Sequence, residues 1–423
     1  MKLLDLLRFQ FLEILKTQSC AQTKMLGATR GLFPKRLCGI FFAALLASTF
    51  GFASPQKNLA AQDPIVQFLK GDISEKTAAV SRAGENSSLA ITALEFVVEN
   101  SETLKNDRDL AGLAVAATLS LSDAEYMRAQ KETVDILKGV FYAFDDDNVR
   151  VSVFDKLAAF YSKKNFEPCV EFINEFLSDA VASKNAAGES ERKAVETLGR
   201  IGNGSSFAPL YSVLRLGLWH EIRPTVEDSL AKIADKSLNE ILDEIEGANL
   251  DSLKSLFKIY QKSEISSSLR SELAENALAK SMMITETSQN SYDLAGFQLE
   301  CAKVLAENKW TRAAELGEKY FGVAKSAFER NFLDEGQFAS AVKCVESISS
   351  RKSVKLFSDY MTQLNKAQEE RNFPSKTVAL AIIDALGTLG DKSAFDCLLY
   401  VTYLDYPEEV TSAARNALTR LKW

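Results

Sequence analysis

The apolar positions near the end of the chain follow the period of a helix. They lie four, three and four residues apart: Val378, Ile382, Ala385 and Leu389. This spacing places them on one face of an amphipathic helix. Ser375 predicts the start of this helix and Gly390 its end. The chain has no long run of alternating Val, Ile and Thr of the kind that strands need, so the pattern predicts a mostly helical protein.

One pattern of apolar and polar positions occurs twice. The stretch "ETLGRIGNGSSFAPL" spans residues 196–210, and "DALGTLGDKSAFDCL" spans residues 384–398, which is 188 residues later. The two copies share leucine, glycine, serine and phenylalanine at six positions. The match continues without a gap, because Leu230 corresponds to Leu418 at the same offset. The repeat therefore covers about forty residues.

A shorter period lies inside each copy. "TLGRI" at 197–201 recurs as "SLAKI" at 229–233, and "ALGTL" at 385–389 recurs as "ALTRL" at 417–421, each 32 residues later. A period of this length is typical of stacked structural repeats. We expect four leucines to occupy equivalent positions in successive layers: Leu198, Leu230, Leu386 and Leu418.

Three pairs of small residues in the two copies have predicted structural roles. The pairs are Gly202 with Gly390, Ser205 with Ser393, and Gly199 with Gly387. The first pair ends a helix in the left-handed conformation, and the serines cap the next helix by accepting backbone N–H bonds. The third pair interrupts a helix where two helices cross closely. Each unit is predicted to pair the helix before this turn with the helix after it.

These residues resemble the HEAT-like repeat family, especially its short bacterial form. The resemblance is specific over residues 191–237 and 375–423 and looser elsewhere, where the unit length varies from about 32 to 42 residues. It implies an all-α fold, an α-solenoid of stacked antiparallel helix pairs forming a HEAT-like superhelix of roughly nine to eleven units. It also implies protein–protein interaction, and it transfers no site residues.

We divide the chain into five segments. They are an N-terminal extension with a secretory signal (1–53), N-terminal helical repeats (54–183), HEAT-like repeats (184–237), irregular helical repeats (238–374), and a C-terminal HEAT-like repeat with a cap (375–423).

The first segment has the residue order of a secretory signal. Three basic residues between positions 30 and 36 precede an apolar run over 37–52, and small residues follow near Ala53. The run is shorter than the roughly 20 residues that a membrane span needs, and Met25 is an alternative start. We expect cleavage near Ala53 and export to the periplasm of a bacterium. The alternatives are an inner-membrane anchor formed by residues 37–52 and a buried core helix.

The charge of the chain excludes one class of partner. Without the first 53 residues the chain has 43 basic and 55 acidic residues. An acidic surface repels phosphate backbones, so we expect no nucleic-acid partner.

Four scattered cysteines remain after residue 53: Cys169, Cys301, Cys344 and Cys397. None forms a CxxC pair, so we expect buried thiols, with one or more disulfides as the alternative.

The sequence contains no recognisable catalytic, metal or cofactor motif. His220 is the only histidine, and it has no HExxH or cysteine pair beside it. The acidic run over 144–150 lacks the spacing of a calcium loop, so Asp147 or Asn148 is expected to cap a helix. "RIGNGSS" follows a helix rather than a strand, which disfavours a phosphate-binding loop.

Trp219 is the one candidate for partner binding. A tryptophan between repeats either anchors an interface or folds back on the neighbouring helix.

We therefore expect an exported, non-enzymatic scaffold that binds a protein or peptide without a cofactor. One alternative is a membrane-tethered scaffold that retains residues 37–52. The other is an enzyme with a catalytic site within 238–375.

Overall fold

The computed structural model describes residues 64–104, 107–122, 130–184, 186–287, 289–348 and 352–422. The chain divides into two compact units, residues 1–70 and residues 71–423. The described part of the first unit is one short helix, α3 (Pro64–Lys70). The predicted signal segment, residues 1–53, lies outside the described residues. The second unit contains the repeats.

The second unit is built from α-helices. In chain order they are α4 (Ile73–Ala83), α5 (Ser87–Ser101), α6 (Arg108–Ser120), α7 (Gln130–Ala143), α8 (Asp147–Lys164), α9 (Glu167–Ser183), α10 (Glu189–Ile201), α11 (Phe207–Arg215), α12 (Arg223–Ile233), α13 (Leu238–Gly247), α14 (Leu250–Lys262), α15 (Ser267–Ser281), α16 (Ser291–Glu307), α17 (Ala314–Glu329), α18 (Glu335–Ile348), α19 (Lys352–Glu369), α20 (Lys376–Leu389), α21 (Phe395–Val401) and α22 (Glu408–Arg420). Short 3₁₀ helices lie in the connections: η3 (Gly204–Ser206), η4 (His220–Ile222), η5 (Ala234–Lys236), η6 (Thr311–Ala313) and η7 (Lys392–Ala394). The described residues contain one isolated β-bridge, between Asp391 and Lys422, and no strand.

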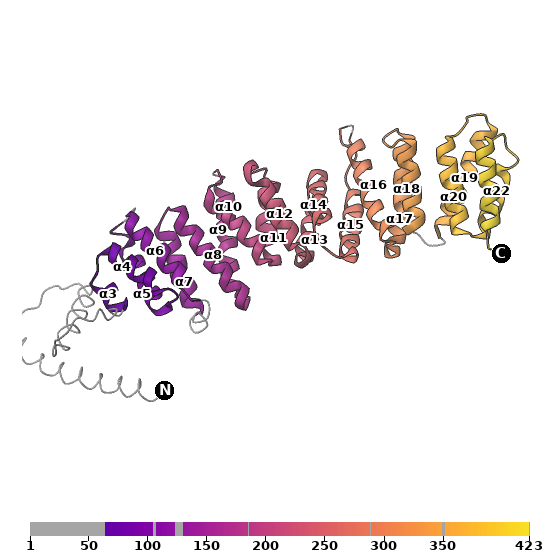
Figure 1. The fold of residues 1–423 in the computed structure, drawn as a ribbon. Coiled ribbons are helices and arrows are strands. Elements are labelled where there is room, and N and C mark those ends of the chain that lie inside the picture. The colour runs from indigo at the N-terminus through magenta and orange to yellow at the C-terminus, as the bar shows by residue number, and fades with distance from the viewer. Residues whose placement is uncertain are drawn as a thin grey trace, which may run out of the picture. The chain divides into compact units, whose positions relative to one another are not determined.

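These helices stand in two layers (Figure 1). Even-numbered helices pack on one another in succession from α4 to α14 and from α16 to α22, and odd-numbered helices do so from α5 to α15. Helix α15 packs against both α14 and α16 and so connects the two runs of even-numbered helices. The second unit is therefore an all-α helical-repeat solenoid.

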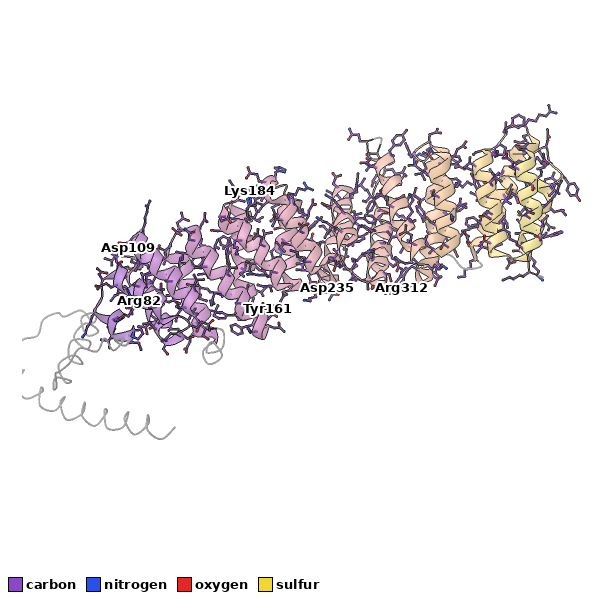
Figure 2. All side chains as sticks on the ribbon, in the orientation of Figure 1. Arg82, Asp109, Tyr161, Lys184, Asp235 and Arg312 are labelled. Atoms are coloured by element: carbon purple, nitrogen blue, oxygen red, sulfur yellow. The ribbon has the colours of Figure 1, made fainter. Side chains whose placement is uncertain are left out.

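The connections between helices lie on two opposite edges of the layers (Figure 2). Lys184, between α9 and α10, marks the edge where odd-numbered helices end. Tyr161, Asp235 and Arg312 lie on the other edge, where even-numbered helices end. The glycine turns at Gly202 and Gly390 follow even-numbered helices, and they therefore belong to this second edge.

The repeat leucines confirm the predicted stacking. All four lie on even-numbered helices, on α10, α12, α20 and α22. Leu198, Leu230 and Leu386 are completely buried, whereas Leu418 on α22 is half-buried. The 32-residue period thus corresponds to one step from an even-numbered helix to the next.

The helix pairs are offset by one helix from the predicted unit. The sequence suggested that α10 pairs with α11, and α20 with α21, across each glycine turn. Instead α11 packs on α12 and α21 on α22, while α10 packs on α9 and α20 on α19. The glycine turn therefore joins consecutive pairs. Its 3₁₀ helix η3 packs on η5, the corresponding turn of the next layer, and so does not fold α11 back onto α10.

The glycine of each turn adopts the predicted conformation, but the cap is a different residue. Gly202 has φ 68° and Gly390 has φ 64°, both left-handed. The predicted serine caps are wrong: the backbone N–H and the hydroxyl of Ser205 both donate to Asn203 Oδ1 at 2.8 Å. Ser393 donates to Asp391 in the same way, at 3.0 and 2.9 Å. An Asx side chain directly after the glycine reaches these donors first.

The cap of α8 also differs by one residue from the prediction. Asp146 accepts hydrogen bonds from the backbone N–H groups of Asn148 and Val149, at 2.8 and 3.2 Å. Asp147, which was expected at this position, instead accepts hydrogen bonds from Ser190 at the start of α10.

Replacing Asn203 by alanine is expected to lower the free energy of unfolding by about 1–2 kcal/mol. The change removes the cap and also the bonds that Asn203 Nδ2 donates to Tyr161 Oη (3.0 Å) and Glu167 Oε2 (2.8 Å). Urea unfolding followed by circular dichroism measures the loss. Ser205→Ala is the control, with a smaller expected effect because Ser205 is exposed. An equal loss in both variants would mean that Ser205 contributes to the cap as much as Asn203 does.

Aromatic side chains fill two parts of the core. The ring of Phe141 lies 5.1 Å from the rings of Phe154, Phe172 and Phe176, where α7, α8 and α9 meet. A second cluster joins Phe321 of α17 to Phe338, Phe357 and Tyr360. These clusters give large apolar contacts between the layers.

Within the described residues, no helix combines the length and apolar content that a membrane span requires.

Candidate functional site

Ion pairs link four of the successive pairs of even-numbered helices. Asp155 on α8 pairs with Lys193 and Arg200 on α10, at 2.9 Å each. Further along the chain the pairs are Glu227–Lys258 and Asp228–Lys262 between α12 and α14, Lys254–Asp293 between α14 and α16, and Arg420–Asp384 between α22 and α20. Among the described residues no ion pair links α10 to α12, and none links α4 to α6, α6 to α8, α16 to α18 or α18 to α20. A groove lies between α10 and α12.

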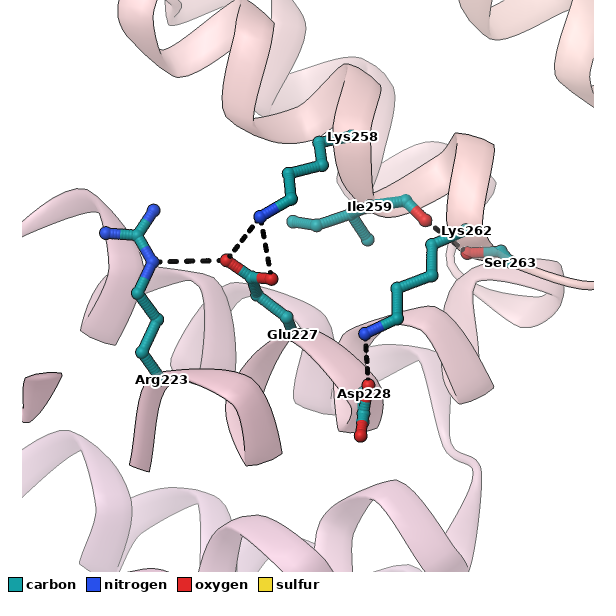
Figure 3. Close-up of polar contacts among 7 residues, drawn as sticks. All are labelled: Arg223, Glu227, Asp228, Lys258, Ile259, Lys262 and Ser263. Atoms are coloured by element: carbon teal, nitrogen blue, oxygen red, sulfur yellow. Dashed lines mark hydrogen bonds and ion pairs between the residues drawn. The ribbon is translucent and has the colours of Figure 1, made fainter. Parts of the chain in front are cut away.

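Glu227 is the best connected of these carboxylates (Figure 3). Its Oε1 accepts a hydrogen bond from Arg223 Nε at 3.1 Å, and Lys258 Nζ lies 3.2 and 3.0 Å from its two oxygens. The Glu227 side chain is 13% exposed. Burial alone would raise the pKa of Glu227, but the hydrogen bonds from Lys258 and Arg223 outweigh burial and hold this pKa below its ordinary value.

Glu227→Gln is expected to lower the free energy of unfolding at pH 7 by up to about 1 kcal/mol, the usual limit for exposed pairs. Because the folded-state pKa of Glu227 lies below its ordinary value of 4.5, its contribution is present above that pH and is lost as the pH falls through the folded-state pKa. The difference between wild type and variant should therefore close below pH 4.5. Urea unfolding at a series of pH values measures it. Glu171→Gln, at an exposed position of α9 with no ion pair among the described residues, is the control and should leave the free energy of unfolding at pH 7 nearly unchanged.

An open groove of about 720 Å³ separates the exposed edges of α10 and α12. A second depression of about 400 Å³ continues it between α12 and α14 and shares Asp228 and Lys232. The charged residues lining the first groove are Lys193, Glu196, Arg200, Asp228, Lys232 and Lys236. Four cations and two anions thus face this groove in a chain whose net charge is −7.

The floor of the groove is a direct contact between two helix backbones. A Cβ atom on Gly199 would lie 2.5 Å from Ser229 Oγ and 2.8 Å from Ser229 Cα, so only glycine permits this approach. The predicted role of Gly199 is confirmed. Beside it, Thr197 is 1% exposed, and its hydroxyl makes no hydrogen bond to any described residue.

Two lysines at one end of the groove have no ion-pair partner among the described residues. Lys232 lies in the last turn of α12, and Lys236 follows in η5. Lys236 Nζ lies 3.2 Å from the position that a Cβ of Gly202 would take. This places the amine at the C-terminal end of α10, where the helix dipole favours a cation.

The second copy of the repeat is closed where the first copy is open. Arg420 covers Gly387, with its guanidinium 2.4–2.8 Å from the position of a glycine Cβ, and it pairs with Asp384 at 3.1 Å. At the offset of 188 residues, four polar residues of the groove correspond to alanines. The correspondences are Lys193 with Ala381, Thr197 with Ala385, Thr225 with Ala413, and Ser229 with Ala417. These differences are present in the sequence. A repeat is recognised from the residues that its copies share, so the four pairs, which differ, did not identify the groove.

The groove does not include the predicted partner-binding residue. Trp219 precedes η4 with φ 51° and is 8% exposed. Contact between its ring and a partner would require the 216–222 connection to open, so its role in binding stays a prediction. The neighbouring His220 is exposed.

The remaining candidate chemistry is sparse within the described residues. No group of three or more His, Cys, Asp or Glu side chains there could hold a metal ion. In the segment 238–374, burial, together with the nearby Asp384, raises the pKa of Glu346, which lines an open depression of about 260 Å³.

Three of the cysteines after residue 53 are buried, and the fourth is half-buried. Cys169, Cys301 and Cys344 belong to the core, and Cys397 is partly exposed. Burial raises the pKa of the Cys301 thiol well above its ordinary value and that of Cys344 to about 11. These two thiols therefore stay protonated and unreactive at neutral pH.

Comparison with known proteins gives no family. No protein-family model and no curated protein matches the chain. Among solved structures, an engineered protein from the Northeast Structural Genomics Consortium is similar over 85% of this chain and 98% of its own, with 14% identity and a TM-score of 0.35. Kap121p bound to Pho4p is similar over 86% of this chain and 46% of its own, with 11% identity and a TM-score of 0.35. At these values we base no statement about this chain on either structure.

Proposed function

We propose that the chain is a non-enzymatic scaffold that binds a protein or peptide partner in the groove between α10 and α12. The observation that carries this proposal is the groove of about 720 Å³, which is lined by polar side chains and floored by a backbone contact at Gly199. Its walls are helices rather than loops, so the lining residues are held in place before a partner arrives. Helical-repeat solenoids use such extended surfaces for binding.

Site-specific photo-cross-linking in the producing cells tests the proposal. Benzoylphenylalanine would replace Thr225 in the groove or, as a control, Lys355 on the exposed surface of α19. We expect a covalent adduct with one defined polypeptide from position 225 and none from position 355. Adducts of the same polypeptide from both positions, or from position 355 alone, would contradict binding in the groove.

We also propose that the repeats are of the HEAT-like type and that the scaffold is exported. The 188-residue and 32-residue periods support the first statement, and the basic–apolar–small order of residues 30–53 supports the second. Export places the scaffold in the periplasm after cleavage near Ala53, and the alternative is a scaffold tethered through residues 37–52. Cell fractionation with mass spectrometry of the mature N-terminus decides between the two. A mature chain that still contains residues 37–52 contradicts cleavage.

A further inference from the structure

We propose that the groove between α10 and α12 binds a carboxylate-rich segment of a polypeptide, held by Lys232 and Lys236. This inference rests on the proposed scaffold function and specifies the chemistry of the partner. Glutamate or aspartate side chains of the segment would pair with the two lysines at the end of the groove.

The lysines supply unpaired positive charge at a defined place. The other cations of the groove are already paired, since Lys193 and Arg200 both contact Asp155. Lys232 and Lys236 have no such partner among the described residues. Of the two acidic groups in the lining, Asp228 is paired with Lys262 on the next helix, and Glu196 forms no ion pair with a described residue. A ligand carboxylate would give these two lysines the ion-pair partner that they lack among the described residues.

The comparison between the two copies shows that an open groove is not a necessary result of the repeat. Glu196 and Lys232 correspond to Asp384 and Arg420 at the 188-residue offset. In the second copy the aspartate and arginine pair with each other, and the arginine lies over the glycine. In the first copy the glutamate and lysine form no such pair, Ser229 rather than a cation lies against Gly199, and the groove beside this contact stays open.

A polypeptide fits this groove better than a nucleic acid does. The whole chain carries a net charge of −7, and Glu196 and Asp228 lie within the lining. Each nucleotide of an extended backbone carries a negative phosphate, so some phosphates would lie beside these carboxylates and be repelled by them. A short acidic segment can place its charges at the lysines alone.

Fluorescence anisotropy with the full-length chain tests the proposal. The probe is a fluorescein-labelled deca-glutamate peptide, and the competing probes are deca-lysine and a ten-nucleotide oligothymidylate. We expect deca-glutamate to bind and the other two to bind at least about tenfold more weakly. Lys232→Glu/Lys236→Glu should weaken deca-glutamate binding about tenfold or more, because like charges then face the probe. Lys303→Glu/Lys355→Glu carries the same charge change at exposed positions outside the groove and should leave binding within about twofold.

A second variant distinguishes binding in the groove from a general electrostatic attraction between the probe and the protein surface. Glu196→Asp/Thr197→Ala/Ser229→Ala/Lys232→Arg installs the residues of the closed copy without changing the net charge. We expect the helical circular dichroism and melting temperature to be retained and deca-glutamate binding to fall about fivefold or more, since the arginine would occupy the groove. Unchanged binding in this variant, or equal losses in the groove and control lysine variants, would overturn the proposal.

The oligothymidylate probe and the cross-linking experiment complete the test. Tighter binding of oligothymidylate than of deca-glutamate would also overturn the carboxylate assignment and would favour a nucleic acid. If cross-linking at position 225 still captures one polypeptide while deca-glutamate fails to bind, the scaffold function stands and only the acidic specificity is wrong. If position 225 captures nothing as well, both proposals fail.

Discussion

Replacing Gly204 by alanine is expected to lower the free energy of unfolding of the solenoid by about 3 kcal/mol. A Cβ atom at this position would lie 2.2 Å from the carbonyl oxygen of Lys236 and 3.0 Å from its carbonyl carbon. Both atoms belong to the backbone of η5, so no side-chain rotation relieves the clash. The 3₁₀ helices of two successive layers would have to move apart, and overpacking of this kind costs 1–3 kcal/mol or more.

Lys392→Ala is the matched control for Gly204→Ala. Lys392 occupies the same position in the second copy of the repeat and already carries a side chain, so its loss should change the unfolding free energy by less than about 0.5 kcal/mol. Urea unfolding followed by circular dichroism measures both variants. Hydrogen exchange would locate the Gly204→Ala effect in α10–α13. A Gly204→Ala protein as stable as wild type would show that the two turns are not in contact.

Gly199→Ala and Gly387→Ala are expected to have opposite effects although the two glycines are equivalent in sequence. At Gly199 the new methyl group would meet the Cα of Ser229 at 2.8 Å, and we expect a loss of about 2–3 kcal/mol. At Gly387 the three nearest atoms all belong to the end of the Arg420 side chain, which can turn away. Alanine is also the better helix former by about 1 kcal/mol, so this second change should be neutral or slightly stabilising.

The same urea series measures this pair. Equal losses at the two sites would mean that Arg420 cannot leave its position over Gly387. Combining Gly387→Ala with Arg420→Ala decides that case. The double variant should recover the stability lost at Gly387 if the arginine is the cause, but should not if the helices themselves are too close.

The stacking of the helices could be predicted from the sequence because it depends on apolar periods. The 32-residue spacing of Leu198 and Leu230 places them on successive even-numbered helices, and the left-handed glycines end the helices where expected. The pairing of helices was wrong because a turn of similar length can close a pair or join two pairs. The sequence does not distinguish these two arrangements, whereas the contact of η3 with η5 in the structure does.

The groove could not be predicted from the residues that the two copies share. Its features lie where the copies differ: a serine instead of an alanine at position 229, and a lysine instead of an arginine at position 232. Gly204 was likewise missed, since its partner Lys392 showed no agreement that would draw attention to it. Trp219 attracted attention by its residue type, and the structure places it largely in the core.

The backbone contact at Gly199 has a kinetic consequence for any ligand of the groove. Because α10 and α12 already touch at Ser229, neither helix can close further around an incoming segment. Capture would need no slow isomerisation of the protein, so the observed association rate should rise linearly with ligand concentration in a single phase. Added salt should lower the association rate, whereas the dissociation rate should depend on the short-range contacts within the complex.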